Sequence, residues 1–218
     1  MALLRVDVIS KALDMATSFM AVLPDEGNLQ KTRVVYLLHG LTDNCTGWTR
    51  YTSCERYARE HGVALIMPEV QRSYYIDGVH GLKYFTYVSQ ELPQMVHRMF
   101  GLPLEKENSY IMGLSMGGYG ALKIALRETG AYSACVALSP VTDLRYLENH
   151  PRLYDAILGE GAPIPPEENP IDLIDTHAGD PEKPDVFLAI GTEDFLYEPA
   201  QTFRKRMETL PYTFTYRE

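Results

Sequence analysis

Cysteine is scarce in this sequence, and so are long hydrophobic runs. The three cysteines, Cys45, Cys54 and Cys135, are an odd number without metal-site spacing, which argues against a disulfide framework. We therefore expect a cytoplasmic protein without a metal or other cofactor, with secretion by a route not visible in the sequence left open. No run of about 18 apolar residues occurs, and charges interrupt the first 14 positions, so we expect neither a membrane span nor a signal peptide.

Basic residues are also few relative to acidic ones. Lys and Arg number 20 against 29 Asp and Glu, for a formal net charge of −9. This balance favours solubility and argues against nucleic acid or an anionic membrane surface as a partner. The remaining composition, 45% hydrophobic and 22% charged, is typical of a globular protein. A length of 218 residues fits one domain, residues 1–218, with a large core.

Short apolar runs alternate with longer mixed segments along the chain. The middle runs are almost wholly apolar and bounded by Gly, Pro or Ser, as in strands of a parallel sheet buried on both faces. The alternation predicts a doubly wound α/β sheet with right-handed crossovers and helices on both faces. The first two runs lack an intervening helix and are expected to pair antiparallel at one edge. The expected strands are 3–9, 15–23, 33–38, 63–67, 109–112, 134–138, 185–190 and 212–216, and the expected helices are 49–60, 89–100, 116–129 and 199–209.

Residues 141–184 break this alternation. They have few periodic apolar positions and are rich in proline, with Pro151, Pro163, Pro165, Pro166, Pro170, Pro181 and Pro184. A segment this long over a sheet either caps a pocket or is a structural excursion, and the sequence leaves both interpretations open.

The stretch IMGLSMGGYG, residues 111–120, contains a G-x-S-x-G pattern centred on Ser115. The pattern alone is weak, but an expected buried strand precedes it and an expected helix follows it. A strand-to-helix turn holds a serine in a strained conformation and projects its hydroxyl above the strand ends. Gly113 would relieve the turn, and Gly117 would let the helix approach the sheet. The alternative is a glycine-rich packing turn without chemistry.

A polar loop follows the strand 33–38 and begins with His39 and Gly40. In an α/β-hydrolase this loop donates one backbone N–H to the oxyanion hole, and the residue after the nucleophile donates the other. Leu41 and Met116 would be these donors. A histidine at a strand end before glycine more often braces the loop by hydrogen bonds than acts as a base, and we expect this of His39.

Two acids follow the strand 185–190, Glu193 and Asp194. A carboxylate after a late strand fits the chain order Ser, Asp, His, in which the acid orients the histidine and stabilises its imidazolium. Asp194 is the candidate. The alternative is that both acids merely begin a helix, where the helix dipole favours them.

These motifs resemble those of the esterase D and tributyrin-esterase group of α/β-hydrolases. The matching stretches, ordered along nearly the whole chain, are YLLHGLTDNCTGW, LIMP, ELPQMV, YIMGLSMGGYGALKIAL and GTEDFLYE. The resemblance implies serine-dependent hydrolysis of short-chain acyl esters through an acyl-enzyme, with no cofactor. It implies Ser115 as nucleophile, Asp194 as triad acid, and Leu41 and Met116 as oxyanion donors.

The resemblance also implies a triad histidine in a loop after the last strand, followed by a C-terminal helix. None of the positions from Asp194 to Glu218 is a histidine. We therefore expect the triad histidine beyond residue 218, and a fold that lacks the histidine loop and the final helix. Replacement by His150 or His177 from the proline-rich segment is the alternative. Of the rest, His61 and His97 are expected on helices, and His80 in a loop near the pocket.

Aromatic residues gather in the loops expected over the site. Most of them would pack the core and a few would line a pocket; they are Trp48, Tyr51, Tyr74, Tyr75, Tyr84, Phe85 and Tyr87. We expect His39, Gly40, Trp48 and His80 to contact the substrate.

The substrate class stays partly open at this point. A feruloyl or acetyl ester, or a thioester of the S-formylglutathione type, fits as well as a simple short-chain ester. A catalytically inactive α/β-hydrolase acting as a binding module is the alternative from another class, and the missing histidine is its one argument. We expect a small-molecule ester as partner, no nucleic acid and no membrane, with a homo-oligomer left open.

Overall fold

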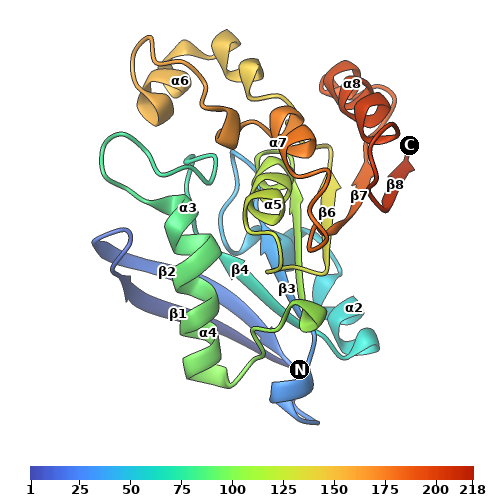
Figure 1. Ribbon diagram of the computed structural model, residues 1–218. Helices are drawn as coiled ribbons and strands as arrows, with labels where there is room; N and C mark the ends of the chain where they lie inside the picture. Colours follow the sequence, from blue (N-terminus) through green and yellow to red (C-terminus); the bar gives the residue numbers. More distant parts are fainter.

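The computed structural model describes residues 1–218 and is built around one eight-stranded sheet (Figure 1). Its strands are β1 (Ala2–Ser10), β2 (Met15–Leu23), β3 (Val34–Leu38), β4 (Ala64–Pro68), β5 (Ser109–Leu114), β6 (Ala134–Leu138), β7 (Asp185–Ala189) and β8 (Phe214–Arg217). Their order across the sheet is β1-β2-β4-β3-β5-β6-β7-β8. β2 pairs antiparallel with β1 and with β4, while all pairs from β4 to β8 are parallel. The predicted α/β sheet with an antiparallel edge is confirmed.

The helices lie between these strands and cover both faces of the sheet. They are α1 (Gly47–Tyr51), α2 (Cys54–His61), α3 (Tyr84–Thr86), α4 (Leu92–Phe100), α5 (Met116–Arg127), α6 (Pro151–Leu158), α7 (Pro170–Thr176) and α8 (Tyr197–Met207). The expected helix 49–60 is two helices, because Thr52 has an extended backbone that ends α1. A short π-helix at Tyr87–Glu91 joins α3 to α4. None of the helices combines the length and the apolar character that crossing a bilayer requires.

Helices α6 and α7 were not expected, and both lie in the proline-rich segment. Pro151 and Pro170 occupy the first position of α6 and of α7. Proline is favourable at that position, because its fixed φ suits a helix and the missing N–H has no intrahelical acceptor there. Two prolines of the segment thus begin helices, although the segment has few periodic apolar positions. In Figure 1, α6 lies beside the loop that precedes α3, and Val79 N–H donates to the Ile157 carbonyl across this contact at 3.4 Å.

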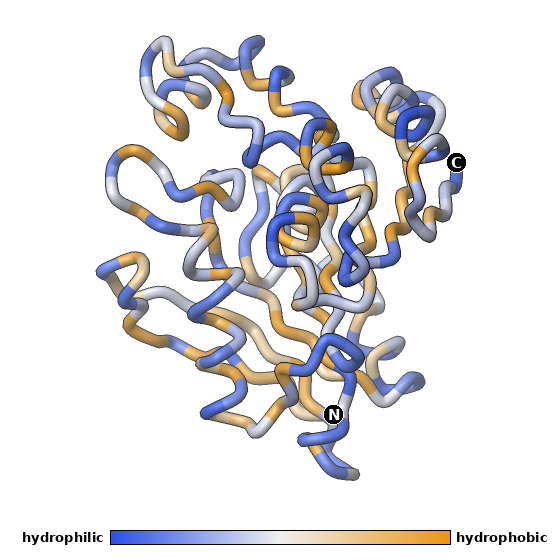
Figure 2. Tube along the Cα trace, in the orientation of Figure 1, coloured by the Kyte–Doolittle hydropathy of each residue, from blue (hydrophilic) through white to orange (hydrophobic).

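Two clusters of buried side chains hold the layers together. The larger contains 46 residues and joins one face of the sheet to α4, α5, α7 and α8. Tyr36, Ile111, Cys135 and Val186 are register partners across β3, β5, β6 and β7 and all belong to it. Figure 2 shows the strands coloured mainly as hydrophobic and the outer loops mainly as hydrophilic. The smaller cluster packs α1 and α2 on the opposite face, where Val136 and Phe187 stay only half-buried.

Candidate active site

The turn between β5 and α5 places Ser115 at the carboxyl end of the sheet. Ser115 has φ 56° and ψ −116°, a strained conformation for a residue with a side chain. Its N–H donates to the Leu138 carbonyl of β6 at 2.9 Å, and its carbonyl accepts from Tyr119 N–H at 3.0 Å. The strand, the strained serine and the helix reproduce the geometry of a nucleophile elbow.

Close backbone packing around the elbow requires glycine at two positions. A Cβ built on Gly113 would overlap the backbone of Gly117, and a Cβ built on Gly117 would overlap the carbonyl of Leu38 in β3. Both contacts are with main-chain atoms, which cannot move without displacing a strand or a helix. Gly117 therefore lets α5 approach β3, as the sequence predicted, whereas Gly113 is required by its contact with Gly117 and not by its own backbone conformation.

Replacing Gly117 by alanine is expected to lower the free energy of unfolding by about 3 kcal/mol, because α5 must move away from β3. Urea denaturation of Gly117→Ala against the parent chain measures this loss. Gly179→Ala is the matched control: nothing lies within 4 Å of a Cβ at Gly179, so a change below about 0.5 kcal/mol is expected. Equal losses in the two variants would mean that the close approach of α5 to β3 is not what requires glycine.

The loop after β3 lies against the elbow. A Cβ built on Gly40 would lie 3.6 Å from the Leu114 carbonyl oxygen and 3.8 Å from Ser115 Cβ. The N–H of Leu41, one residue on, donates to no acceptor in the chain, and the N–H of Met116, as the first residue of α5, has no acceptor within that helix. The backbone N–H groups of Leu41 and Met116, the two predicted oxyanion donors, thus have no hydrogen-bond acceptor in the places just described.

The His39 side chain controls how this loop is oriented. It is only 1% exposed, its Nδ1 lies 2.8 Å from the Gly40 carbonyl oxygen, and its Nε2 accepts from Val70 N–H at 3.2 Å. With Nε2 accepting from Val70 N–H, Nδ1 is the ring nitrogen that donates to the Gly40 carbonyl. The Gly40 carbonyl and the Leu41 N–H belong to one planar peptide and point in opposite directions. By holding the carbonyl, His39 therefore aims the Leu41 N–H away from itself.

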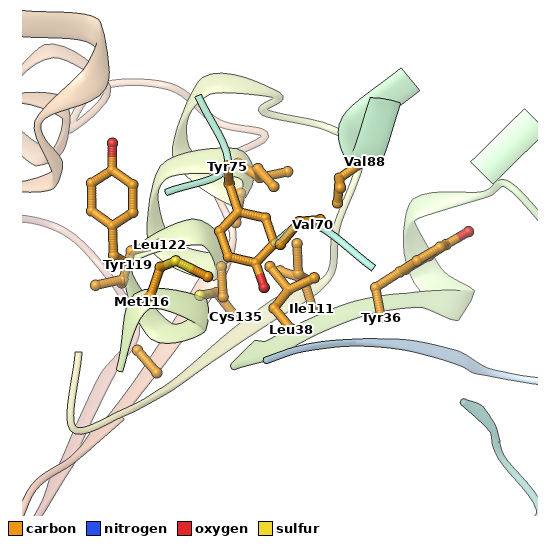
Figure 3. Packing of buried hydrophobic residues seen from close by; sticks show 14 of the residues in the cluster. Tyr36, Leu38, Val70, Tyr75, Val88, Ile111, Met116, Tyr119, Leu122 and Cys135 are labelled. Carbon is orange, nitrogen blue, oxygen red and sulfur yellow. The ribbon is translucent and has the colours of Figure 1, made fainter. Parts of the chain in front are cut away.

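Tyr75 supports the same loop from the side of α5. Its buried hydroxyl donates to the His39 carbonyl at 2.9 Å, and its ring packs so closely on Gly120 of α5 that a Cβ there would overlap it. Figure 3 shows Tyr75 between Leu38 and Met116, at the centre of the core. Tyr75 and its neighbour Tyr74 both have positive φ, 54° and 53°, which means that tertiary contacts hold this segment against local preference.

A buried charge network anchors Tyr75. The Lys123 ammonium is fully buried in α5 and donates to the Tyr75 carbonyl at 2.5 Å and to Glu168 Oε2 at 2.6 Å. Arg127 pairs with the other carboxylate oxygen of Glu168 at 2.5 Å. Burial lowers the pKa of Lys123 to about 8, and the Glu168 carboxylate opposes this shift. Helix α5, the Tyr75 segment and the start of α7 are thereby tied together behind the elbow.

No local sequence pattern predicts this network. Lys123 lies in α5 between the apolar residues Leu122 and Ile124. A lysine is almost never fully buried, so one in a helix is usually expected at the surface. Glu168 lies in the proline-rich segment, 45 positions away, and no periodicity connects the two. From the sequence, Tyr75 is only one of several aromatic residues in the loops expected over the site. Their roles depend on long-range contacts that no local pattern encodes.

The predicted acid lies in the loop after β7. Asp194 is half-buried, and its Oδ1 accepts from Leu196 N–H at 2.9 Å, while its Oδ2 accepts no hydrogen bond within the chain. One strand, β6, separates β5 from β7, so the two strand ends are about 10 Å apart. Ser115 and Asp194 therefore follow strands that end at the same edge of the sheet, on either side of β6.

None of the six histidines forms a hydrogen bond to Ser115 or Asp194. His39 is occupied by the loop contacts described above, and His97 Nδ1 lies 2.7 Å from the Leu102 carbonyl oxygen. His61 ends α2, and His177 follows α7. His80 and His150 both line a cavity that is also lined by Leu41 of the loop after β3.

This cavity has a volume of about 750 Å³ and lies between the loop that precedes α3, the start of α6, and Leu41. Of the predicted substrate contacts, His80 lines it and Gly40 lies against Ser115. His39 and Trp48 do not line it, since His39 is buried as a brace and the Trp48 indole N–H donates to the Leu38 carbonyl at 3.2 Å. Most of the loop aromatics pack the core as expected; Tyr84 also reaches the cavity.

A strained serine between a parallel strand and a helix, beside unpaired backbone N–H groups, defines the α/β-hydrolase class of serine hydrolases. The family model described as "Putative esterase" matches residues 10–217. The chain belongs to this esterase family, a family of carboxylic-ester hydrolases, as the sequence motifs predicted.

Individual relatives agree with this assignment. An acetyl esterase of Caldicellulosiruptor saccharolyticus is 25% identical over 220 residues, which cover 91% of this chain and 83% of the relative. An S-formylglutathione hydrolase of Bos taurus is 28% identical over 155 residues, 61% of this chain. The match spans about half the length of that bovine protein, 54%.

Solved structures resemble the whole chain. The fluorophosphonate-binding serine hydrolase FphF of Staphylococcus aureus superposes with a TM-score of 0.87 at 31% identity, covering 99% of this chain and 90% of the other. The S-formylglutathione hydrolase FrmB from the same organism gives a TM-score of 0.88 at 30% identity, with the same coverage.

Proposed function

We propose that this chain is a serine carboxylesterase that hydrolyses short-chain acyl esters through an acyl-enzyme. Ser115 is the nucleophile, Asp194 is the triad acid, and Leu41 and Met116 donate the oxyanion hole. One observation carries the proposal: a serine in a strained elbow lies directly beside a loop whose Leu41 N–H has no acceptor in the chain.

In the proposed mechanism, Ser115 Oγ attacks the ester carbonyl and loses its proton to an imidazole. The carbonyl oxygen becomes an oxyanion, which accepts hydrogen bonds from the N–H groups of Leu41 and Met116. Each such donor stabilises the transition state by about 3 kcal/mol. The alcohol then leaves with the proton from the imidazole, and water attacks the acyl-enzyme, with the same imidazole acting as base.

In this proposal, the imidazole occupies the gap between Ser115 and Asp194, where the free Oδ2 of Asp194 can accept from its ring N–H. None of the six histidines is hydrogen-bonded to Ser115 or Asp194, so the proposal assigns the role of base to none of them. A carboxylate in this position fixes the ring orientation and stabilises the imidazolium without taking its proton.

Substrate length gives a direct test of the proposed specificity. With imidazole supplied at a saturating concentration as the base, the value of kcat/KM for p-nitrophenyl acetate is expected to exceed that for p-nitrophenyl octanoate by about tenfold, a discrimination within reach of pocket contacts. Ser115→Ala is the control: the rate measured with this variant is the rate that does not depend on Ser115, and it is subtracted. A binding module would give the same rate with and without Ser115, and a preference for octanoate would rule out a short-chain esterase.

Thioester hydrolysis is the second candidate. FrmB and the bovine relative both bear the name S-formylglutathione hydrolase, and the serine mechanism applies equally to a thioester carbonyl. The cavity beside Leu41 is lined by Arg72 and Arg152, which favours a charged substrate of this general kind.

A further inference from the structure

The cavity beside the oxyanion loop is cationic, although the protein as a whole carries a net charge of −9. Its lining includes Arg72, Arg152, His80 and His150, and contains no aspartate or glutamate. Neither arginine forms an ion pair with an acid of the chain. In a protein with more acidic than basic residues, most arginines could pair with an acid of the same chain. The two unpaired guanidinium groups in this cavity are therefore available to an anionic ligand.

The four basic residues come from two segments that pack on each other. Arg72 and His80 lie in the loop between β4 and α3, while His150 and Arg152 lie at the start of α6. These segments are joined by the hydrogen bond from Val79 N–H to the Ile157 carbonyl. Glu69 and Asp77 are the acids nearest in sequence to the first pair: the Glu69 carboxylate accepts from the N–H groups of Cys45 and Gln71, and Asp77 accepts from Thr86 N–H at 2.9 Å and Thr86 Oγ1 at 2.6 Å. Glu148 and Asp155 flank the second pair in the sequence and form no ion pair with Arg152.

The rest of the cavity lining is mixed but has a substantial apolar part. Leu41, Ile76, Leu82, Tyr84, Leu153 and Ile157 contribute it, and Leu41 belongs to the oxyanion loop. A ligand that reaches from the elbow into the cavity therefore meets apolar side chains and guanidinium groups. This combination suits a molecule with an apolar body and a carboxylate away from the scissile bond.

We propose that the cavity selects anionic esters, with Arg72 and Arg152 binding a substrate carboxylate. The inference rests on the proposed esterase function. Arginine suits this task, because its planar donors match the two oxygens of a carboxylate and its charge persists at every physiological pH. The carboxylate belongs either to the acyl part or to the alcohol part of the ester, and the test separates the two.

The test compares kcat/KM at saturating imidazole for pairs of esters, one with and one without a carboxylate. On the acyl side, p-nitrophenyl hydrogen glutarate is paired with p-nitrophenyl valerate; on the alcohol side, a p-nitrophenyl acetate carrying a ring carboxylate is paired with p-nitrophenyl acetate. Arg72→Gln and Arg152→Gln are each expected to lower the anionic-to-neutral ratio by about fivefold in one of the two arms, and the double variant by more than tenfold. Arg98→Gln, on the exposed side of α4 and outside the cavity, should leave both ratios unchanged.

The outcomes separate this inference from the proposed function. A ratio that stays within twofold of the parent chain in both arms overturns the inference, as does an equal loss on neutral and anionic esters, which would indicate damage to the fold. The neutral esters and Ser115→Ala test the esterase function by itself. If neutral esters are hydrolysed by a route independent of Ser115, the proposed function fails, whatever the arginine variants do.

Discussion

Imidazole added to the 218-residue chain is expected to accelerate ester hydrolysis by about 10²-fold, in a saturable manner. A positioned general base contributes 10²–10⁴ to a rate, and a base diffusing from solution recovers part of this. In the proposed triad an imidazole from solution lies between Ser115 and Asp194, where the free Oδ2 of Asp194 can orient it. A continuous assay of p-nitrophenyl acetate over a range of imidazole concentrations measures the effect.

Two variants give this expectation its controls. In Ser115→Ala, imidazole should add only its direct reaction with the ester, because no nucleophile remains to be activated. In Asp194→Asn, the acceleration should fall by about tenfold or more, since the amide does not stabilise an imidazolium. If instead one of the six histidines were the base, the chain would be fully active without imidazole and would lose activity when that histidine was replaced.

Exchanging His39 for glutamine is expected to lower kcat by about 10²-fold. The glutamine side chain can still accept from Val70 N–H, but it has no donor in the position of Nδ1. The Gly40 carbonyl then loses its hydrogen bond, and the Leu41 N–H of the same peptide is no longer held toward the proposed oxyanion. Loss of one oxyanion donor has an effect of this size. KM should change little, because the oxyanion forms only in the transition state. The measurement is steady-state kinetics at saturating imidazole.

His39→Asn is the matched variant. Its amide N–H takes the place of Nδ1–H and can donate to the Gly40 carbonyl, while the acceptor for Val70 N–H is lost. We expect it to retain at least tenfold more kcat than His39→Gln. A purely structural role for His39 would instead lower kcat in both variants in proportion to their loss of unfolding free energy, and that result would contradict the proposed aiming of Leu41 N–H.

Local patterns were sufficient for the strands and for the elbow. The run SYIM followed by glycine, serine and an apolar helix predicts a strand-to-helix turn, because each of those segments has a clear preference of its own. The structure places the turn there and gives Ser115 the expected positive φ. Gly117 was interpretable for the same reason, since only close backbone contact explains a glycine at the start of a helix.

Features that depend on contacts between distant segments were not predictable. Arg72 and Arg152 line the same cavity although they are 80 positions apart in the sequence. Arg72 lies in a loop and Arg152 in the first turn of α6, a helix that was not expected, and no periodicity relates the two positions. His39 illustrates a middle case. The sequence indicated that it braces its loop, but only the structure names the Gly40 carbonyl and Val70 N–H as its partners and so connects the ring to the Leu41 peptide.

The central claim is that Ser115 is the nucleophile, and peptide mapping of a fluorophosphonate-treated protein tests it most directly. A second serine, Ser139, also has a positive φ at a strand end, 42°, and provides an internal comparison. Mass spectrometry is predicted to find the adduct on the peptide that contains Ser115, formed faster when imidazole is present. An adduct on Ser139 or another residue, or none on Ser115 at saturating imidazole, would contradict the account.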